Sequence, residues 1–157
     1  MVCQRLLDIE FQEETATLPN CYITLKSWSG LAPASYLTNI SMAKYRWAFS
    51  RARFNAFPSA VLEGRFQKQP MEQRLCSCNT DQIESIAHIL LFCPLYHSIR
   101  NSLIFPLLSH FTNFMPIATY NSGKMVKLLL RDKDPNISQM VAKFLYISTR
   151  IKSCKVN

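Results

Sequence analysis

Apolar residues near the end of the chain recur at intervals of three and four positions, the spacing that places them on one face of a helix. The residues in this register are Ile137, Met140, Val141, Phe144, Leu145, Ser148 and Ile151. The pattern predicts an amphipathic helix from Ile137 to about Lys152. A shorter helix is predicted just before it, over residues 122–132.

A long uninterrupted segment earlier in the chain predicts a second major helix. Residues 34–56 contain neither glycine nor proline, and Pro58 follows them. Successive residues of a helix are separated by ~100° around its axis. One stripe of this helix is therefore apolar and is expected to face the core: Tyr45, Ala48, Phe49, Ala52 and Ala56.

The remaining segments predict shorter elements and little or no β structure. Residues 57–73 combine a turn, a short helical or extended piece and a basic linker. Pro94 suits the first position of a helix that runs to about Leu108. Only residues 21–28, CYITLKSW, have the β-branched and aromatic content of a strand. The sequence therefore predicts a mainly α fold.

Positive charge is concentrated in two parts of the chain. The formal net charge is +8, and residues 44–74 and 121–157 carry most of the excess. Such an excess favours polyanionic partners, of which nucleic acid is the usual one. A basic surface that is merely solvated is the alternative.

The helix predicted over residues 34–56 places two aromatic rings between two rows of cations. The rows are Lys44 with Arg51 and Arg46 with Arg53, and the rings are those of Trp47 and Phe54. Rings flanked by cations suit stacking on bases combined with contacts to phosphates. The alternative is a central helix that packs on two sides and buries both rings.

The composition argues against several other classes of protein. No apolar run reaches the ~18 residues that a membrane span requires. The first fifteen residues carry acids and lack the apolar core of a signal peptide. We expect a nuclear or cytoplasmic protein with reduced thiols and no membrane partner, in which clustered cysteine and histidine favour a metal over disulfides.

Three of the six cysteines and one of the three histidines lie within residues 74–96, and a second histidine, His97, follows directly. The spacing is Cys76-x-Cys78, nine residues, His88, four residues, Cys93. Zinc commonly takes four tetrahedral ligands, one close pair from a turn and a second pair from a helix end. The sequence therefore predicts a structural Zn²⁺ site at these four residues, because four protein ligands leave no open coordination position.

The residues around the cluster suggest how the ligands converge. Asp81 is expected to cap the following helix, with Glu84 in the capping-box position. Glu84 also precedes His88 by four residues and is expected to accept its second ring N–H. Pro94 disfavours helical geometry at Cys93, so the chain should bend there and turn the thiolate toward the histidine.

Other arrangements of the cluster remain open at this point. His97, one turn beyond Cys93, is an alternative ligand to His88. A disulfide between Cys76 and Cys78 would be strained. The remaining cysteines and His110 are expected to be structural or incidental.

The segments RARFNAFPSAVLEGRF, RLCSCN and IESIAHILLFCPLYHSIR form a wider pattern over roughly residues 44–110. A basic helix, a close cysteine pair, an acid four residues before a histidine and Cys-Pro-x-Tyr follow one another. This region resembles the C-terminal zinc-knuckle region of non-LTR (LINE-type) retrotransposon reverse transcriptases. The resemblance implies the same four ligands and a region that holds template RNA and target DNA downstream of the polymerase.

The chain departs from that family in its catalytic parts. It has no F/Y-x-D-D motif and no adjacent aspartates, and its ten acids are scattered. Metal-dependent phosphoryl transfer needs clustered carboxylates. We therefore expect no polymerase or endonuclease activity and no small-molecule substrate.

The resulting hypothesis is a non-catalytic module that binds zinc and nucleic acid, either a fragment or a stand-alone descendant of such a reverse transcriptase. It would hold RNA or DNA mainly through phosphates, and the polymerase domain of a full-length enzyme is a further candidate partner. The alternatives are a zinc-stabilised protein-interaction module and a non-functional retrotransposon remnant. The expected organisation is an N-terminal segment of uncertain order (1–33), a basic helix and linker (34–73), a CCHC zinc knuckle with its following helix (74–110) and C-terminal helices (111–157).

Overall fold

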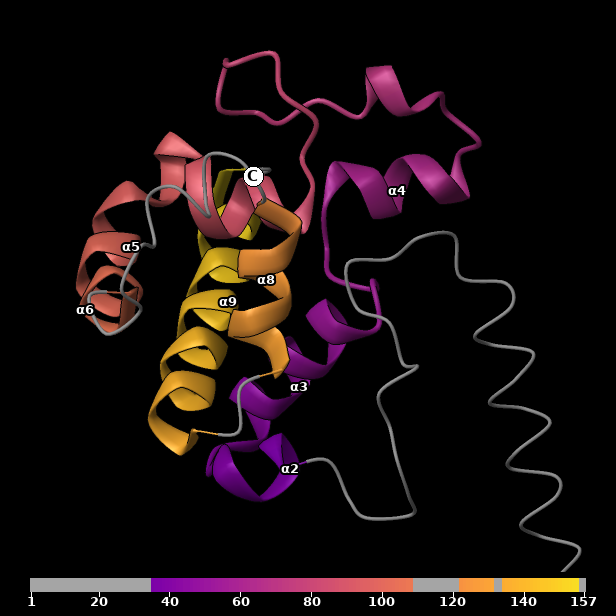
Figure 1. Ribbon diagram of the computed structural model, residues 1–157. Helices are drawn as coiled ribbons and strands as arrows, with labels where there is room; N and C mark the ends of the chain where they lie inside the picture. Colours follow the sequence, from indigo (N-terminus) through magenta and orange to yellow (C-terminus); the bar gives the residue numbers. More distant parts are fainter. Residues whose placement is uncertain (1–34, 109–121, 132–133, 156–157) are drawn as a thin grey trace, which may run out of the picture.

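The longest helix of the computed structural model, α9 (Pro135–Lys155), is the element on which the helices labelled α2, α3, α5 and α8 pack (Figure 1). Its start is specified by Asp134, whose Oδ1 accepts hydrogen bonds from the backbone N–H groups of Asn136, at 2.7 Å, and Ile137, at 3.4 Å. Pro135 occupies the first helical position, where its missing N–H costs nothing. The helix predicted from Ile137 to Lys152 is confirmed, and the Asp-Pro cap begins it two residues earlier.

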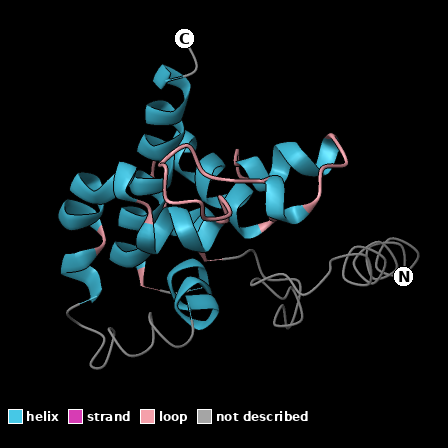
Figure 2. Cartoon of the chain, turned by 90° about the horizontal axis from the view of Figure 1, so that it is seen from above, coloured by secondary structure: helices cyan, strands magenta, loops and turns pink. Residues whose placement is uncertain are grey.

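The structure describes residues 35–108, 122–131 and 134–155. The strand predicted over residues 21–28, the segment 1–33 and His110 lie outside these ranges. Within them the fold is mainly helical and has no strand, only an isolated antiparallel bridge between Leu75 and Ile83 (Figure 2). The described elements before α9 are α2 (Tyr36–Asn39), α3 (Ala43–Arg53), α4 (Ala60–Phe66), η2 (Met71–Gln73), η3 (His88–Phe92), η4 (Pro94–Tyr96), α5 (His97–Leu103), α6 (Phe105–Leu108) and α8 (Ser122–Arg131).

The single helix predicted over residues 34–56 is wrong, because the structure forms the separate helices α2 and α3. Ile40 breaks the helical path with φ −92° and ψ 108°, and its side chain is fully buried. Arg46 Nη1 donates to the freed carbonyl of Ile40, at 2.7 Å, and to that of Ser41, at 3.0 Å. The break therefore buries an isoleucine, and an arginine satisfies the exposed backbone. α3 also ends three residues early, before Asn55, whose φ is +54°.

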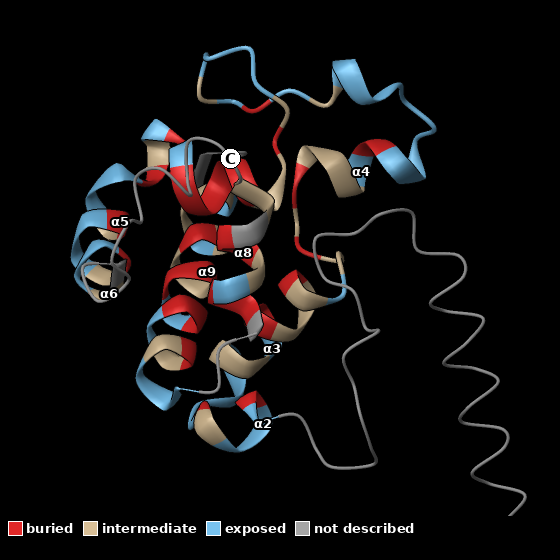
Figure 3. Ribbon diagram, viewed as in Figure 1, coloured by how far each residue is buried: buried red, intermediate tan, exposed pale blue. Residues whose placement is uncertain are grey.

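The central part of the apolar stripe predicted for this region faces the core, Tyr45 packs at its edge, and Ala56 lies beyond the end of α3 and is half-buried. Ala48, Phe49 and Ala52 are buried, and α3 packs along α9 more extensively than any other described pair of helices (Figure 3). From α9, Val141, Ala142, Phe144 and Leu145 are buried in the same core, together with Met125, Val126, Leu129 and Leu130 of α8. Met140, predicted to face the core, is instead 38% exposed.

The region after Pro94 is helical, as predicted, but it is divided. A 3₁₀ turn, η4, leads into α5, and Ile104 separates α5 from α6. The helix predicted at 122–132 is confirmed as α8. In the described part of the chain, none of the helices has the length and apolar character needed to cross a membrane.

α4 and the loop that follows it are joined by Arg74, which lies across Gly64. Arg74 donates to the carbonyl of Gln69, from Nε at 3.1 Å and Nη2 at 2.6 Å, and from Nη1 to the carbonyl of Val61 at 3.2 Å. A Cβ at residue 64 would lie 2.6 Å from Arg74 Cγ. The glycine is therefore required by this close approach, and the arginine anchors the strand-like segment that leads to Cys76.

Replacing Gly64 with alanine is expected to destabilise the protein by about 1–2 kcal/mol, because the new methyl group displaces Arg74 from its carbonyl partners. In a helix without this contact the same change would stabilise by about 0.5–1 kcal/mol. In an Arg74→Ala background, Gly64→Ala is therefore expected to stabilise the protein instead of destabilising it. Urea denaturation of the two single variants and the double variant measures this, and a Gly64→Ala change that is stabilising in both backgrounds would contradict it.

Candidate metal centre

A small hairpin presents the first two cysteines. The Leu75–Ile83 bridge is extended by hydrogen bonds from Cys76 N to Gln82 O, at 2.8 Å, and from Glu84 N to Arg74 O, at 2.9 Å. The turn between its arms contains Asn79 and Asp81 with φ of +60° and +51°. Asparagine and aspartate tolerate this left-handed conformation better than most residues. The sequence Asn79-Thr80-Asp81 thus closes a tight turn directly after Cys78.

The helix that carries His88 begins later than predicted. Helical geometry starts at Ile86, and Ser85 Oγ accepts a hydrogen bond from His88 N at 3.2 Å. Asp81 therefore belongs to the turn of the hairpin, and Glu84 to its second arm. The capping box predicted for Asp81 and Glu84 is wrong, because Ser85 supplies the cap.

A wide helical turn brings His88 and Cys93 to the same side. Residues His88–Phe92 form a π-helix, closed by a hydrogen bond from Cys93 N to His88 O at 2.7 Å. Residues five apart stand one turn apart in this geometry, whereas an α-helix would separate them around the axis. Cys93 itself leaves the helix, with φ −58° and ψ 122°, as predicted for the residue before Pro94. The wide turn and the proline together direct its thiol toward the hairpin.

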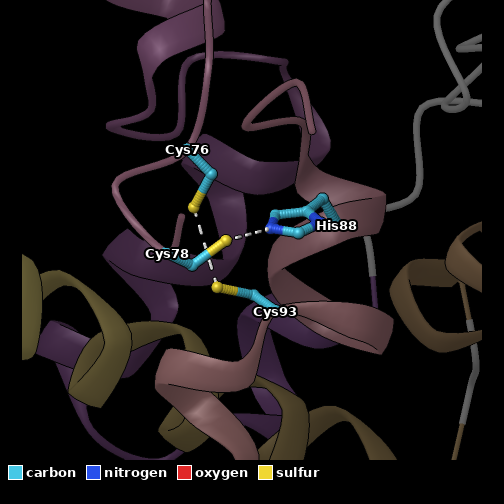
Figure 4. Close-up of side chains that lie close together, drawn as sticks. All are labelled: Cys76, Cys78, His88 and Cys93. Atoms are coloured by element: carbon cyan, nitrogen blue, oxygen red, sulfur yellow. Dashed lines mark hydrogen bonds between the residues drawn. The ribbon is translucent and has the colours of Figure 1, made fainter. Parts of the chain in front are cut away.

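The four predicted ligands converge (Figure 4). The Sγ atoms of Cys76, Cys78 and Cys93 and a ring nitrogen of His88 all lie within 4.8 Å of one another. Cys76 Sγ is 3.7 Å from Cys93 Sγ, and Cys78 Sγ is 3.3 Å from His88 Nε2. Zn–S bonds of ~2.3 Å in a tetrahedron separate two sulfurs by ~3.8 Å. The donor set and its spacing therefore fit a tetrahedral zinc ion bound by three thiolates and one imidazole.

The partner of the other ring nitrogen of His88 is Gln82. His88 Nδ1 is 2.9 Å from Gln82 Oε1, so with Nε2 toward the metal, Nδ1–H donates to the amide oxygen. The hydrogen bond predicted from His88 to Glu84 is not formed. Glu84 precedes the helix and lies in the extended arm, so the four-residue separation does not place it one helical turn from His88.

Glu84 is nevertheless buried beside the cluster, on the side of Cys76. Its Oε1 lies 3.9 Å from Cys76 Sγ, and its Oε2 accepts from Ala60 N and from Lys152 Nζ, the latter at 2.8 Å. Lys152 also pairs with Glu63 at 3.2 Å. The carboxylate thus ties the hairpin to the start of α4 and to the end of α9.

Arg100 is a residue of this centre that the sequence reasoning missed. Its side chain is 3% exposed and donates from Nε to Leu90 O, at 2.8 Å, and from Nη2 to Ile89 O, at 3.1 Å, and Cys93 O, at 2.7 Å. Ile89 and Leu90 belong to the π-helix, and Cys93 is the residue at which it ends, so Arg100 holds this end of the helix. The available signal was positional: Arg100 lies midway between Tyr96 and Ile104, in the buried stripe of the helix begun by Pro94.

Burial controls the protonation of the free thiols. Burial raises the pKa of Cys76 and of Cys93 above the ordinary value for a thiol. Burial acts in the same direction on Cys78, but hydrogen bonds with Thr80 and Cys76 outweigh it and lower the pKa of Cys78. Burial also lowers the pKa of His88, which favours the neutral imidazole that a metal requires. Zinc binding therefore displaces protons from the two most buried thiols.

The buried charges around the cluster balance when a divalent ion is bound. Three thiolates exceed the charge of Zn²⁺ by one, and Glu84 adds a second negative charge beside Cys76. Arg100, at the carbonyl of Cys93, and Lys152, on Glu84, supply two positive charges. Compensation of this kind is what makes charges tolerable in a buried site.

The six residues predicted to bind nucleic acid divide into two groups. Arg46 holds the break after α2, and Arg53 donates to Leu130 O of α8 and lies 4.9 Å from the ring centroid of Tyr36. The other four form the α3 outer face: Lys44, Trp47, Arg51 and Phe54. Lys44, Trp47 and Phe54 are exposed and Arg51 is half-buried. The alternative in which both rings are buried is wrong, since Trp47 is 48% and Phe54 41% exposed.

His97 does not join the cluster. It is exposed, and its Nε2 lies 3.1 Å from Asn101 Nδ2, on the same short helix. The described part of the chain therefore offers one set of four converging metal ligands, and it is the set that the sequence predicts.

Comparisons with known proteins do not assign this chain to a family. No protein-family model, no curated protein and no solved structure matches it. The mainly helical fold and the Cys₃His cluster are thus the properties on which a function has to be argued.

Proposed function

We propose that this chain is a zinc-stabilised, non-catalytic nucleic-acid-binding module, akin to the C-terminal zinc-knuckle region of non-LTR retrotransposon reverse transcriptases. The single observation that carries the proposal is the Cys₃His cluster, whose four ligand atoms lie within 4.8 Å of one another. The ion is structural, because four protein ligands complete its tetrahedron and leave no position for a substrate or a reactive water.

The position of the cluster in the fold supports a structural role. Its ligands come from a hairpin and from a helix end, and Glu84, Lys152 and Arg100 join them to α4, α5 and α9. A metal that holds such a junction contributes its binding free energy to folding. The role of the ion is therefore to fix the hairpin against the helical core.

Charge supports the choice of partner. The chain carries 18 lysines and arginines against 10 acids, and its pI is about 9.4. Cations of this number attract the phosphate backbone of RNA and DNA and give binding with little sequence preference. The order of basic helix, cysteine pair and Cys-Pro-x-Tyr motif supports the relation to the reverse-transcriptase tail.

Binding of RNA and DNA is expected to weaken steeply as salt rises, because each phosphate contact releases counterions. For about five contacts the affinity should fall by roughly two to three orders of magnitude between 50 and 200 mM salt. Fluorescence anisotropy of labelled oligonucleotides across a salt series measures this. A flat salt response, or the same affinity for a neutral polymer, would remove the nucleic-acid part of the proposal and leave the zinc site standing.

A second candidate function is a zinc-stabilised protein-interaction module. The observation that favours it is the exposure of large apolar side chains on several elements, with Phe66 of α4 at 78% and Phe92 of η3 at 46%. Neither of these rings belongs to the α3 outer face. A module of this class would bind a protein partner through them and would be indifferent to RNA and DNA.

A further inference from the structure

We infer that the α3 outer face binds single-stranded nucleic acid, with bases on the rings of Trp47 and Phe54 and phosphates on Lys44 and Arg51. This inference rests on the proposed function and adds to it the class of nucleic acid and the surface. Four observations support it. Two cations of α3 have structural partners, the other residues form one stripe, the Trp47–Arg51 pair at its centre has a fixed geometry, and the exposed rings suit stacking on bases.

The fold itself consumes two of the four cations of α3. Arg46 is turned toward the backbone before the helix, and Arg53 toward α8 and Tyr36. These arginines hold the helix in place, so their spacing along the sequence is explained without a ligand. Arg51 also donates to a backbone carbonyl, that of Ala56, but its guanidinium lies beside the exposed ring of Trp47.

The remaining residues form one continuous stripe. Lys44, Trp47, Arg51 and Phe54 are spaced i, i+3, i+7 and i+10, so they fall on one face of the helix. By the helical period, its two rings lie on the side of α3 opposite Ala48, Phe49 and Ala52, which are buried in the core. Segment Ala43–Arg53 contains four cations and no acid, so the stripe complements a polyanion and not a mixed surface.

The centre of the stripe is held in a fixed arrangement. The guanidinium of Arg51 lies 4.8 Å from the ring centroid of Trp47, and its Nε donates to Ala56 O at 2.7 Å. The carbonyl of Ala56 thus holds the guanidinium of Arg51 beside the indole before any ligand arrives. Such preorganisation lowers the entropy lost on binding. At the start of α3, Lys44 Nζ lies 5.2 Å from the ring centroid of Tyr146.

The exposed rings select single strands over duplexes. A base can stack on a protein ring only when its own face is free, and in a duplex both faces are covered by neighbouring base pairs. A duplex would therefore use the cations alone and leave about half of each ring in water. Seven residues at 1.5 Å per residue set the two rings about 10 Å apart along the axis, so one strand of several nucleotides can reach both.

The test uses the full-length chain and a Trp28→Phe background, in which the tryptophan fluorescence reports Trp47. A 12-nucleotide oligo-uridine or oligo-thymidine strand is titrated in parallel with a 12-base-pair duplex at one salt concentration. We expect the single strand to quench Trp47 and to bind at least tenfold more tightly than the duplex. Trp47→Ala should weaken the single strand about 5- to 100-fold and leave the duplex within about twofold, as stacking of a base on one ring predicts.

Phe66→Ala is the matched control, because it removes the most exposed described aromatic ring, which lies on α4 and not on α3. It should change neither affinity. Equal binding of strand and duplex, or a Trp47→Ala variant that binds both as before, would overturn the inference while the proposed function stands, and would leave the face for a protein partner. Binding of neither nucleic acid, even at low salt, would overturn both.

Discussion

Replacing Cys76 with serine is expected to abolish zinc binding and to destabilise the protein by several kcal/mol. The hydroxyl keeps the size of the thiol but is a poor zinc ligand, and three ligands no longer close the tetrahedron. Structural zinc sites contribute apparent binding free energies of about 10–16 kcal/mol in small peptides, a part of which appears here as folding free energy. The wild-type chain should contain one zinc per molecule by elemental analysis, and the variant close to none.

The loss should be local before it becomes global. Hydrogen exchange is expected to rise first in the hairpin of residues 74–84, which the metal joins to η3, and later in α3 and α9, whose buried residues share one core with those of η3. A chelator should have the same effect on the wild type. Cys21→Ser is the matched control, since Cys21 is not one of the four predicted ligands and its replacement should leave the zinc content unchanged. Wild-type protein that purifies without zinc and is insensitive to chelator would contradict the prediction.

The ligands could be predicted from the sequence because their signal is local. Cys76, Cys78, His88 and Cys93 lie within 18 residues. Pro94 restricts the backbone of Cys93 to extended conformations, and this effect does not depend on distant parts of the fold. The shape of the helix between the ligands could not be predicted in this way. The choice of a π turn from His88 depends on the carbonyls that Arg100 satisfies, and Arg100 lies on another element.

Partners that are distant in the sequence account for the other differences between the predicted and the observed structure. Glu84 was expected to serve His88 because four residues separate them, but it pairs with Lys152, which is 68 residues away. The break at Ile40 carries no glycine or proline and arises because the isoleucine is buried while Arg46 satisfies its carbonyl. The regular spacing of apolar residues predicted α9 and the buried stripe of α3, because in both helices a single face packs against the core. Interactions between elements leave no such repeat in the sequence.

Replacing Arg100 with methionine is expected to lower the free energy of unfolding by about 3–5 kcal/mol, the usual range for uncovering a buried charged network. Methionine fills much of the volume, but it cannot replace the hydrogen bonds that the guanidinium donates to the carbonyls of Ile89, Leu90 and Cys93. The π turn that aims Cys93 at the hairpin then loses its anchor, and the thiolates lose a positive charge. Zinc affinity, measured by competition with a chromophoric chelator, should fall at least tenfold.

The Arg100→Lys variant separates the two contributions. Lysine restores the charge, but a single ammonium group cannot donate to all three carbonyls in the geometry of the guanidinium. If charge balance dominates, zinc affinity returns while stability does not; if the anchored turn dominates, both stay low. Arg150→Met, at an exposed position of α9, should change stability by less than about 0.5 kcal/mol. An Arg100→Met protein with wild-type stability and zinc affinity would show that Cys93 is positioned by its own turn, without help from the neighbouring helix.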